Sequence, residues 1–252
     1  MIDIKKAEDE FKLYVSKFDT NNSNIERKTL HSFRVEEICR KIAKELKLRE
    51  EQIELATLIG LLHDIGRFEQ YTKYQTFSDY KSIDHGQLGI EILEENKYIR
   101  KYIEDNKFDK IIEKAIYNHN KYLLQDNLND EEKLFSKIIR DSDKLDICKE
   151  AIEIFWSDKE KKIETQGISK EVISQFKNKE LIEHKFKNGI VDDIVGIISY
   201  IYDFNFKESY IFLKEENYIN KLIDRFKFRE DVAIEMEELR KIANEYIEEK
   251  TK

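Results

Sequence analysis

Apolar residues recur at spacings of three and four along most of the chain, and this pattern predicts a protein built from helices. Residues 5–18 form a first amphipathic segment, and a polar stretch at 19–24 separates it from a second segment at 29–46. The apolar stripe of that second segment consists of Val35, Ile38, Cys39, Ile42 and Leu46. Extending the stripe backwards by four positions reaches His31, so we expect His31 to face the interior.

The next predicted helix is the most apolar part of the chain. Residues 53–65 are apolar on almost every side, which indicates a helix that is buried over most of its surface. His63 and Asp64 lie near its end, and we expect Gly66 to terminate it. Two titratable side chains at the end of a buried helix need partners, because an unpaired polar group is costly to bury.

Residues 68–84 mix aromatic and polar side chains without a helical period, and we expect an ordered loop that covers a pocket. Its aromatic side chains either stack on a nucleotide base or pack the loop down; they are Tyr71, Tyr74, Phe77 and Tyr80. Asp84 is the predicted N-cap of the following helix. One face of that helix carries His85, Leu88, Gly89 and Ile92.

Two more inward stripes follow. The first, in residues 109–124, contains Ile112, Ala115, Ile116, His119 and Leu123. The second, in residues 131–155, contains Phe135, Ile139, Asp143 and Ile147. Residues 166–252 indicate three or so further helices with charged outer faces. The absence of proline and the presence of only seven glycines also favour an all-α fold, because β-architectures need many turn residues.

Composition and charge limit the partners. The net charge of −8 argues against bulk nucleic-acid binding through a basic surface. It permits a small phosphorylated substrate, since a bound metal reverses the local potential. Cys39 and Cys148 lie inside helical patterns without ligand spacing, which is typical of a reducing compartment. No apolar run reaches about 18 residues, so we expect a cytoplasmic protein without membrane association.

Four of the five histidines fall on inward stripes: His31, His63, His85 and His119. The fifth, His184, has a surface-like context. A single inward histidine is ordinarily a hydrogen-bonded core residue. Four of them, together with inward Asp64 and Asp143, form the mixed imidazole and carboxylate set that transition metals require. His63 and Asp64 are adjacent and point about 100° apart on a helix, which suits a carboxylate that bridges two cations.

The motifs "HSFRV", "LLHDIGR" and "RDSDKLD" resemble the H…HD…D signature of the HD-domain metal-dependent phosphohydrolase superfamily. The resemblance covers roughly residues 27–155, which it marks as a metal-site core. It implies an HD-domain-like helical bundle. Because the sequence contains no convincing linker, we expect one all-α domain of residues 1–252, with residues 166–252 as a C-terminal helical extension. The implied ligands of a first metal are His31, His63, Asp64 and Asp143. We prefer Asp143 to Asp141, because Asp143 shares the stripe of Ile139.

His85 and His119 resemble the two extra histidines of family members with binuclear sites, in which the aspartate of the HD pair bridges. The resemblance therefore implies two divalent transition metal ions, with iron or manganese favoured and nickel, cobalt, zinc or magnesium as alternatives. The implied activity is a phosphohydrolase or phosphodiesterase. Such an enzyme cleaves a phosphate ester of a nucleotide or another small phosphorylated molecule with metal-activated water. The stretch "NHNKYLLQ" replaces the GYP element of cyclic-di-GMP phosphodiesterases, which argues against a cyclic dinucleotide.

The predicted catalytic residues are Asp64, Arg67 and Lys144. We expect the side chains of Arg67 and Lys144 to hold the phosphate group. For Arg67, a helix-end cation paired with Glu69 is the competing interpretation. Asn118 and Asn120 flank His119 and are predicted to support the ligands from a second layer. Two other functions stay open: a di-iron oxygenase on the same scaffold, and a non-catalytic domain that binds metal or a nucleotide for regulation. The complete ligand set argues against the second.

Overall fold

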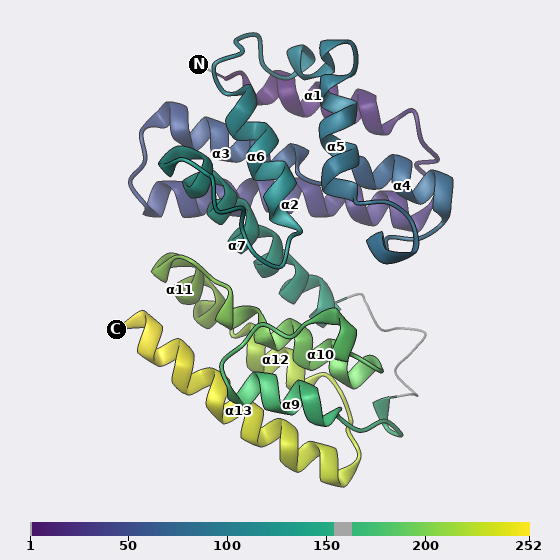
Figure 1. Cartoon of the computed structure of the whole chain (residues 1–252), viewed down its shortest axis with the longest axis vertical. Coiled ribbons are helices and arrows are strands. Elements are labelled where there is room, and N and C mark those ends of the chain that lie inside the picture. Colours follow the sequence, from purple (N-terminus) through teal and green to yellow (C-terminus); the bar gives the residue numbers. More distant parts are fainter. Residues whose placement is uncertain (1, 154–162) are drawn as a thin grey trace. The chain divides into compact units, whose positions relative to one another are not determined.

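The computed structural model describes residues 2–153 and 163–252, and no strand occurs among them. This confirms the predicted all-α fold (Figure 1). The chain divides into two compact units, Met1–Asp143 and Lys144–Lys252, with the boundary inside helix α7 (Asp130–Glu153). The predicted arrangement of a single domain with a core at 27–155 and an extension at 166–252 stays a prediction. Positions 154 and 155 of the predicted helix lie outside the described residues.

The first unit is built around α3 (Glu50–Leu62). Three helices pack on it: α1 (Ile4–Val15), α2 (Ser23–Glu45) and α6 (Asp109–His119). The short α4 (Gly66–Tyr74) contacts α2 and α5 (His85–Glu94), and α5 in turn contacts α6. Two 3-10 turns, η1 (Asp79–Lys81) and η2 (Glu95–Lys101), lie before and after α5.

Side chains at the helix starts explain where several helices begin. Asp3 accepts a hydrogen bond from the backbone N–H of Lys6, and Asn22 accepts one from Asn24. Asp84 accepts from two backbone N–H groups at the start of α5, which confirms it as the predicted N-cap. Each cap satisfies donors that a helix start leaves unpaired.

The central helix ends earlier than predicted. Every residue of α3 from Leu55 to Leu62 is buried, as its apolar pattern indicates, but the helix stops at Leu62 and His63 follows as its C-cap. Gly66 does not terminate α3 and instead begins α4, so that part of the prediction was wrong. A Cβ atom at Gly66 would lie 2.3 Å from the carbonyl oxygen of His85, so the glycine is required for close packing of α4 on α5.

The predicted loop at 68–84 was also partly wrong, because α4 continues to Tyr74. Phe68 is fully buried and its ring packs edge-on against Phe11 and Tyr14 of α1. The inward face of α4 is therefore fixed by an aromatic cluster with a distant helix, which a local periodicity does not reveal. The stripe predicted to end at Leu123 was wrong at that residue, since α6 ends at His119 and Leu123 is 74% exposed.

Beyond the end of α7, the described residues of the second unit form five α-helices. They are α9 (Lys170–Lys177), α10 (Ile190–Ile198), α11 (Lys207–Glu215), α12 (Tyr218–Asp224) and α13 (Glu230–Thr251). The long α13 packs against α9, α11 and α12. The turn η3 (His184–Phe186) lies between α9 and α10, and η4 (Ser199–Tyr202) lies between α10 and α11. The sequence predicted about three helices, because helices of seven to nine residues are too short for a clear period.

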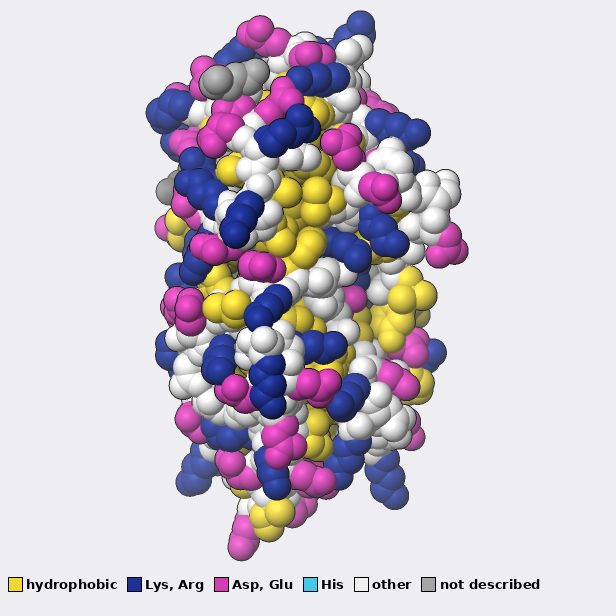
Figure 2. Space-filling view, turned by 90° about the vertical axis from the view of Figure 1, so that its left-hand side faces the viewer, with side chains coloured by type: hydrophobic (Ala, Val, Ile, Leu, Met, Phe, Trp, Pro, Cys, Tyr) yellow, Lys and Arg dark blue, Asp and Glu magenta, His cyan; other side chains and the backbone are white. Residues whose placement is uncertain are grey.

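The surface carries charges of both signs. The face in Figure 2 shows basic and acidic side chains interspersed, with no continuous basic area. Within the part of the chain that the structure describes, no helix is both long and apolar enough to cross a membrane.

Candidate metal centre

Two histidines of neighbouring helices bring their ring nitrogens together in the first unit. His31 of α2 and His63 at the end of α3 are fully buried, and their Nε2 atoms lie 3.3 Å apart. Asp143 of α7 faces the same point, with Oδ1 3.1 Å from Nε2 of His31 and 3.6 Å from Nε2 of His63. The preferred Asp143, 15% exposed, therefore lies at this histidine pair. Asp141 is fully buried.

A second histidine pair lies on the other side of Asp64. Nε2 of His85, at the start of α5, is 2.9 Å from Nε2 of His119, at the end of α6. Asp64 Oδ1 is 3.3 Å from His85 and 3.6 Å from His119. Its other oxygen, Oδ2, is 3.5 Å from His31 and 3.7 Å from His63. One carboxylate therefore presents a different oxygen to each pair, which is the arrangement of a bridging ligand.

Hydrogen bonds fix the protonation of three of these imidazoles. Nδ1 of His63 donates to the carbonyl oxygen of Gly60 at 2.7 Å, and Nδ1 of His119 donates to Ile116 at 2.5 Å. Nδ1 of His85 donates to Oδ2 of Asp79 at 2.6 Å. Carbonyl and carboxylate oxygens only accept, so the proton occupies Nδ1 and the lone pair is on Nε2.

These lone pairs converge, and a cation held between them would relieve their repulsion. Ligand nitrogens about 2.1 Å from a metal lie roughly 3.0–3.4 Å from one another in tetrahedral or octahedral geometry. The observed 3.3 Å between His31 and His63 lies in that range, and the 2.9 Å between His85 and His119 lies just below it. Two triads that share Asp64 bring their ligand atoms within 4.8 Å of one another: His31, His63 and Asp64, and Asp64, His85 and His119. The donor set thus fits divalent metal.

The electrostatics favour the ligand forms of these groups. Burial lowers the pKa of His119 to about 4, and the neighbouring His85 and His63 add to that shift although Asp64 opposes it, so the ring is neutral at pH 7. Burial alone would raise the pKa of Asp64, but the charge of Lys28 holds it well below its usual value. Burial is likewise outweighed at Asp143, where the neighbouring His31 and His63 hold the pKa well below its usual value.

A second layer holds His85 in place. Asp79, on η1, accepts from Nδ1 of His85 and from Arg67 Nη1 at 2.9 Å. Asn120 donates to Asp79 Oδ2 at 3.1 Å and to Asp84 Oδ1 at 2.9 Å, which agrees with the supporting role predicted for it. Carboxylates that orient a histidine ligand raise its basicity and fix its tautomer. The sequence did not point to Asp79, because its place beside His85 depends on the fold of the intervening loop.

The predicted catalytic cations have protein partners. Arg67 Nη1 donates to Gln70 Oε1 at 2.7 Å, to the Phe77 carbonyl at 2.6 Å and to Asp79, and Arg67 Nε lies 3.5 Å from Asp64 Oδ1. Arg67 thus joins the loop to the histidine cluster, and Glu69 pairs instead with Lys73 at 2.7 Å.

Lys144 belongs to the second unit, where it pairs with Asp203 at 2.9 Å and lies over the Tyr200 ring. Phosphate binding by Lys144 stays a prediction, as it does for Arg67.

The aromatic residues of the segment at 68–84 behave in two ways. Tyr71 and Phe77 stack on each other with ring centroids 4.9 Å apart, so they pack the loop down onto α4. Tyr74 and Tyr80 are 47% and 93% exposed. Stacking of any of the four on a nucleotide base stays a prediction.

A buried arginine holds the segment that follows His119. Arg140 of α7 is 2% exposed and donates to the carbonyl oxygens of Asn118, Lys121 and Tyr122. These carbonyls lie at and just beyond the end of α6, where a helix leaves acceptors unpaired. Arg140 therefore anchors the segment that follows His119. Asn118 contributes there too, because its Oδ1 accepts from the backbone N–H of Gln125.

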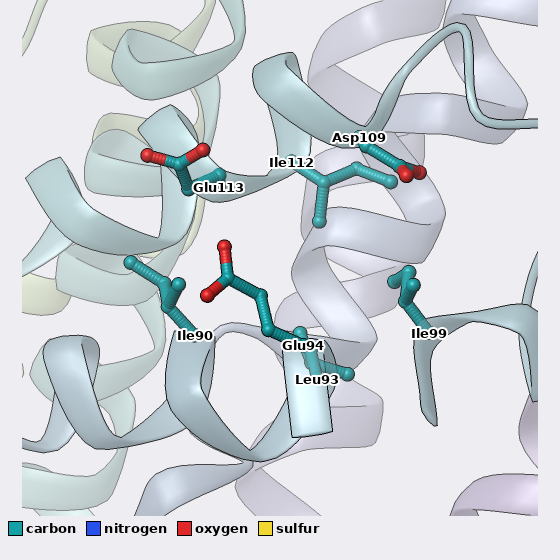
Figure 3. Close-up of a pocket in the computed structure, with 7 residues that line it drawn as sticks. All are labelled: Ile90, Leu93, Glu94, Ile99, Asp109, Ile112 and Glu113. Atoms are coloured by element: carbon teal, nitrogen blue, oxygen red, sulfur yellow. The ribbon is translucent and has the colours of Figure 1, made fainter. Parts of the chain in front are cut away.

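A separate cavity of about 90 Å³ lies between α5, η2 and α6. Its lining is Ile90, Leu93, Glu94, Ile99, Asp109, Ile112 and Glu113. Figure 3 shows the carboxylate of Glu94 in the gap beside Ile90, whereas the carboxylate of Glu113 points away from it. None of the predicted site residues lines this cavity.

Comparison with known proteins gives one match. The family model of the HD domain matches residues 30–159, which is just over half of the chain. No curated protein and no solved structure matches the chain.

Proposed function

Because the chain belongs to the HD domain family, we propose that it is a metal-dependent phosphohydrolase or phosphodiesterase. The substrate of this proposal is a phosphate ester of a nucleotide or of another small phosphorylated molecule, and the nucleophile is water. Members of the family are typically metal-dependent hydrolases, and the His/Asp cluster is able to hold metal.

One observation carries the proposal. Each oxygen of Asp64 faces its own pair of imidazole Nε2 atoms, at 3.3–3.7 Å. Two cations held by one carboxylate suit an in-line displacement at phosphorus, because both the attacking and the leaving oxygen need charge stabilisation.

The proposed ligands divide between two positions. His31, His63 and Asp143 serve the first, His85 and His119 serve the second, and Asp64 bridges. When bound, divalent cations lower the pKa of a coordinated water to about 7 and offset charge on a phosphoryl oxygen. Iron or manganese suits this mixed nitrogen and oxygen set, as do nickel, cobalt and zinc, with magnesium as the weakest match.

The chain's own residues keep the site in its reactive state. The Nδ1–H bonds to Gly60, Ile116 and Asp79 aim each Nε2 at the cations and prevent rotation of the rings. The burial of the four histidines excludes bulk water, which strengthens every electrostatic interaction inside.

The proposed partner is a small phosphorylated molecule. Neither bulk nucleic acid nor a membrane is part of the proposal, and the mixed charges in Figure 2 agree with this. A cytoplasmic location remains part of the proposal.

The test begins with metal analysis of protein purified without added metal. A panel of phosphomonoesters and phosphodiesters then follows, with phosphate release and oxygen consumption measured in parallel. We expect phosphate release that His63→Ala and Asp64→Ala abolish, together with a loss of bound metal. Turnover that survives both substitutions would rule out the site, and oxygen consumption without phosphate release would select the oxygenase.

A further inference from the structure

Lys28 is a buried cation beside the candidate metal centre. It lies on α2 one turn before His31, and it is 9% exposed. Its ammonium nitrogen is 2.8 Å from Oδ2 of Asp64. Lysine is rarely buried unless its charge is paired, so this position needs an explanation.

The oxygen that Lys28 contacts is also the oxygen of the first metal position. Oδ2 of Asp64 is the atom that faces His31 at 3.5 Å and His63 at 3.7 Å. A carboxylate oxygen has two lone pairs and is able to accept both an N–H donor and a cation. The two positive charges then lie close together and repel each other. Lys28 therefore opposes cation binding, whereas a residue kept only to build the metal site would favour it.

The surroundings of Lys28 supply no other counter-charge. Its remaining contact among the described residues is with the Phe77 ring, whose centroid is 5.7 Å from Nζ. The guanidinium groups of Arg27 and Arg67 lie 5.3 Å and 5.8 Å from the same ring centroid. Three cations from α2 and α4 thus gather around Phe77, beside Asp64. With Asp64 neutralised by metal, Lys28 would need another anion as its partner.

We propose that Lys28 binds the phosphoryl group of the substrate when Asp64 holds metal. The ligand class is a tetrahedral oxyanion whose oxygens accept from the ammonium while the cations polarise the same group. This inference rests on the proposed function. It makes Lys28 a substrate-binding residue, and it explains why a lysine is buried at a position where it weakens metal binding.

The inference predicts opposite effects on two ligands. Lys28→Met should bind Mn²⁺ as tightly as the wild type or more tightly, because a like charge is removed. The same variant, loaded with Mn²⁺, should bind inorganic phosphate about tenfold or more weakly, which is the usual loss for a charge-assisted hydrogen bond. Lys28→Arg should keep most of the phosphate affinity. If Lys28 were needed only for folding, Lys28→Met would instead lower both the Mn²⁺ affinity and the phosphate affinity.

The experiment is calorimetric titration of Mn²⁺ into the metal-free protein, and of phosphate into the Mn²⁺-loaded protein. Lys44→Met is the matched control, because Lys44 is an exposed lysine on the same helix. On an ester that the wild type cleaves, Lys28→Met should raise KM more than it lowers kcat. If Lys28→Met is insoluble, Lys28→Gln and Lys28→Arg provide the same comparison.

Two negative results are distinguishable. Unchanged phosphate affinity in Lys28→Met, or a loss of Mn²⁺ affinity without an effect on phosphate, overturns the role of Lys28 and leaves the hydrolase proposal intact. A wild-type protein that binds Mn²⁺ but neither binds phosphate nor cleaves any ester overturns both.

Discussion

Gly60 controls how closely α2 and α3 approach, and its replacement by alanine tests whether that approach builds the metal centre. A Cβ atom at Gly60 would lie 2.9 Å from Cys39 Sγ and 2.9 Å from Glu36 Cα, both on α2. It would also lie 3.0 Å from the carbonyl oxygen of Val35. Two of these three contacts are with main-chain atoms, so the helices themselves must separate.

The size of the effect follows from these distances. Carbon atoms prefer about 3.5–4.0 Å, so α3 has to move from α2 by roughly 0.6–1 Å. Overpacking of this kind costs about 1–3 kcal/mol, and the better helix propensity of alanine returns up to ~1 kcal/mol. We therefore expect Gly60→Ala to lower the free energy of unfolding by about 1–2 kcal/mol.

The same movement affects metal binding. The carbonyl oxygen of Gly60 accepts the hydrogen bond that fixes His63, and His63 and His31 lie on the two separating helices. An added separation of ~1 Å takes the Nε2 pair beyond the spacing that one cation spans, so we expect a 10- to 100-fold loss of Mn²⁺ affinity.

Urea denaturation with and without Mn²⁺, and calorimetric titration of Mn²⁺, measure the two effects. Gly167→Ala is the control, because a Cβ atom there has only an ordinary contact at 3.5 Å. A Gly60→Ala protein with wild-type stability and wild-type Mn²⁺ affinity would refute this reasoning.

Three further predictions concern the ligands and the buried carboxyl of α2. His119→Ala should remove about one of two bound metals per chain, measured by elemental analysis, and an unchanged count would argue for a single-metal site. Asp79→Ala should weaken Mn²⁺ binding about 10- to 100-fold because His85 loses its orienting carboxylate, whereas the neighbouring Tyr80→Ala should have no effect. Glu36 is 2% exposed, and burial, followed by the charge of Glu8, raises its pKa from 4.5 to about 8. The folded state therefore binds this proton more tightly, and its contribution to stability, complete below about pH 4.5, falls by ~1.4 kcal/mol per pH unit until about pH 8. Glu36→Gln should remove that slope in urea denaturation at several pH values, and an unchanged slope would contradict the shift.

The sequence was sufficient for the features that depend on local spacing. His31 and His119 follow from stripes at intervals of three and four, and Asp84 follows from the residue preference of a helix start. The three motifs added the family, which the match over residues 30–159 shows.

Features that depend on tertiary contacts could not be predicted from the sequence. Helix α4 owes its inward face to Phe68 in a distant aromatic cluster, so its local pattern was read as a loop. Gly66 was assigned to helix termination, although a close approach of α5 requires it. Lys28 shares the face of His31, three residues away, and that signal was present but was not used. No signal in the sequence pointed to Asp79, because only the fold of the loop brings its carboxylate to His85.

Arg140 holds the segment after His119 through main-chain atoms and not through side chains. The guanidinium recognises carbonyl oxygens at positions 118, 121 and 122, and every amino acid has a carbonyl oxygen at that place. The anchor itself therefore does not depend on which side chains stand at 121 and 122, although the ammonium of Lys121 also pairs with Asp84, the N-cap of the helix that carries His85.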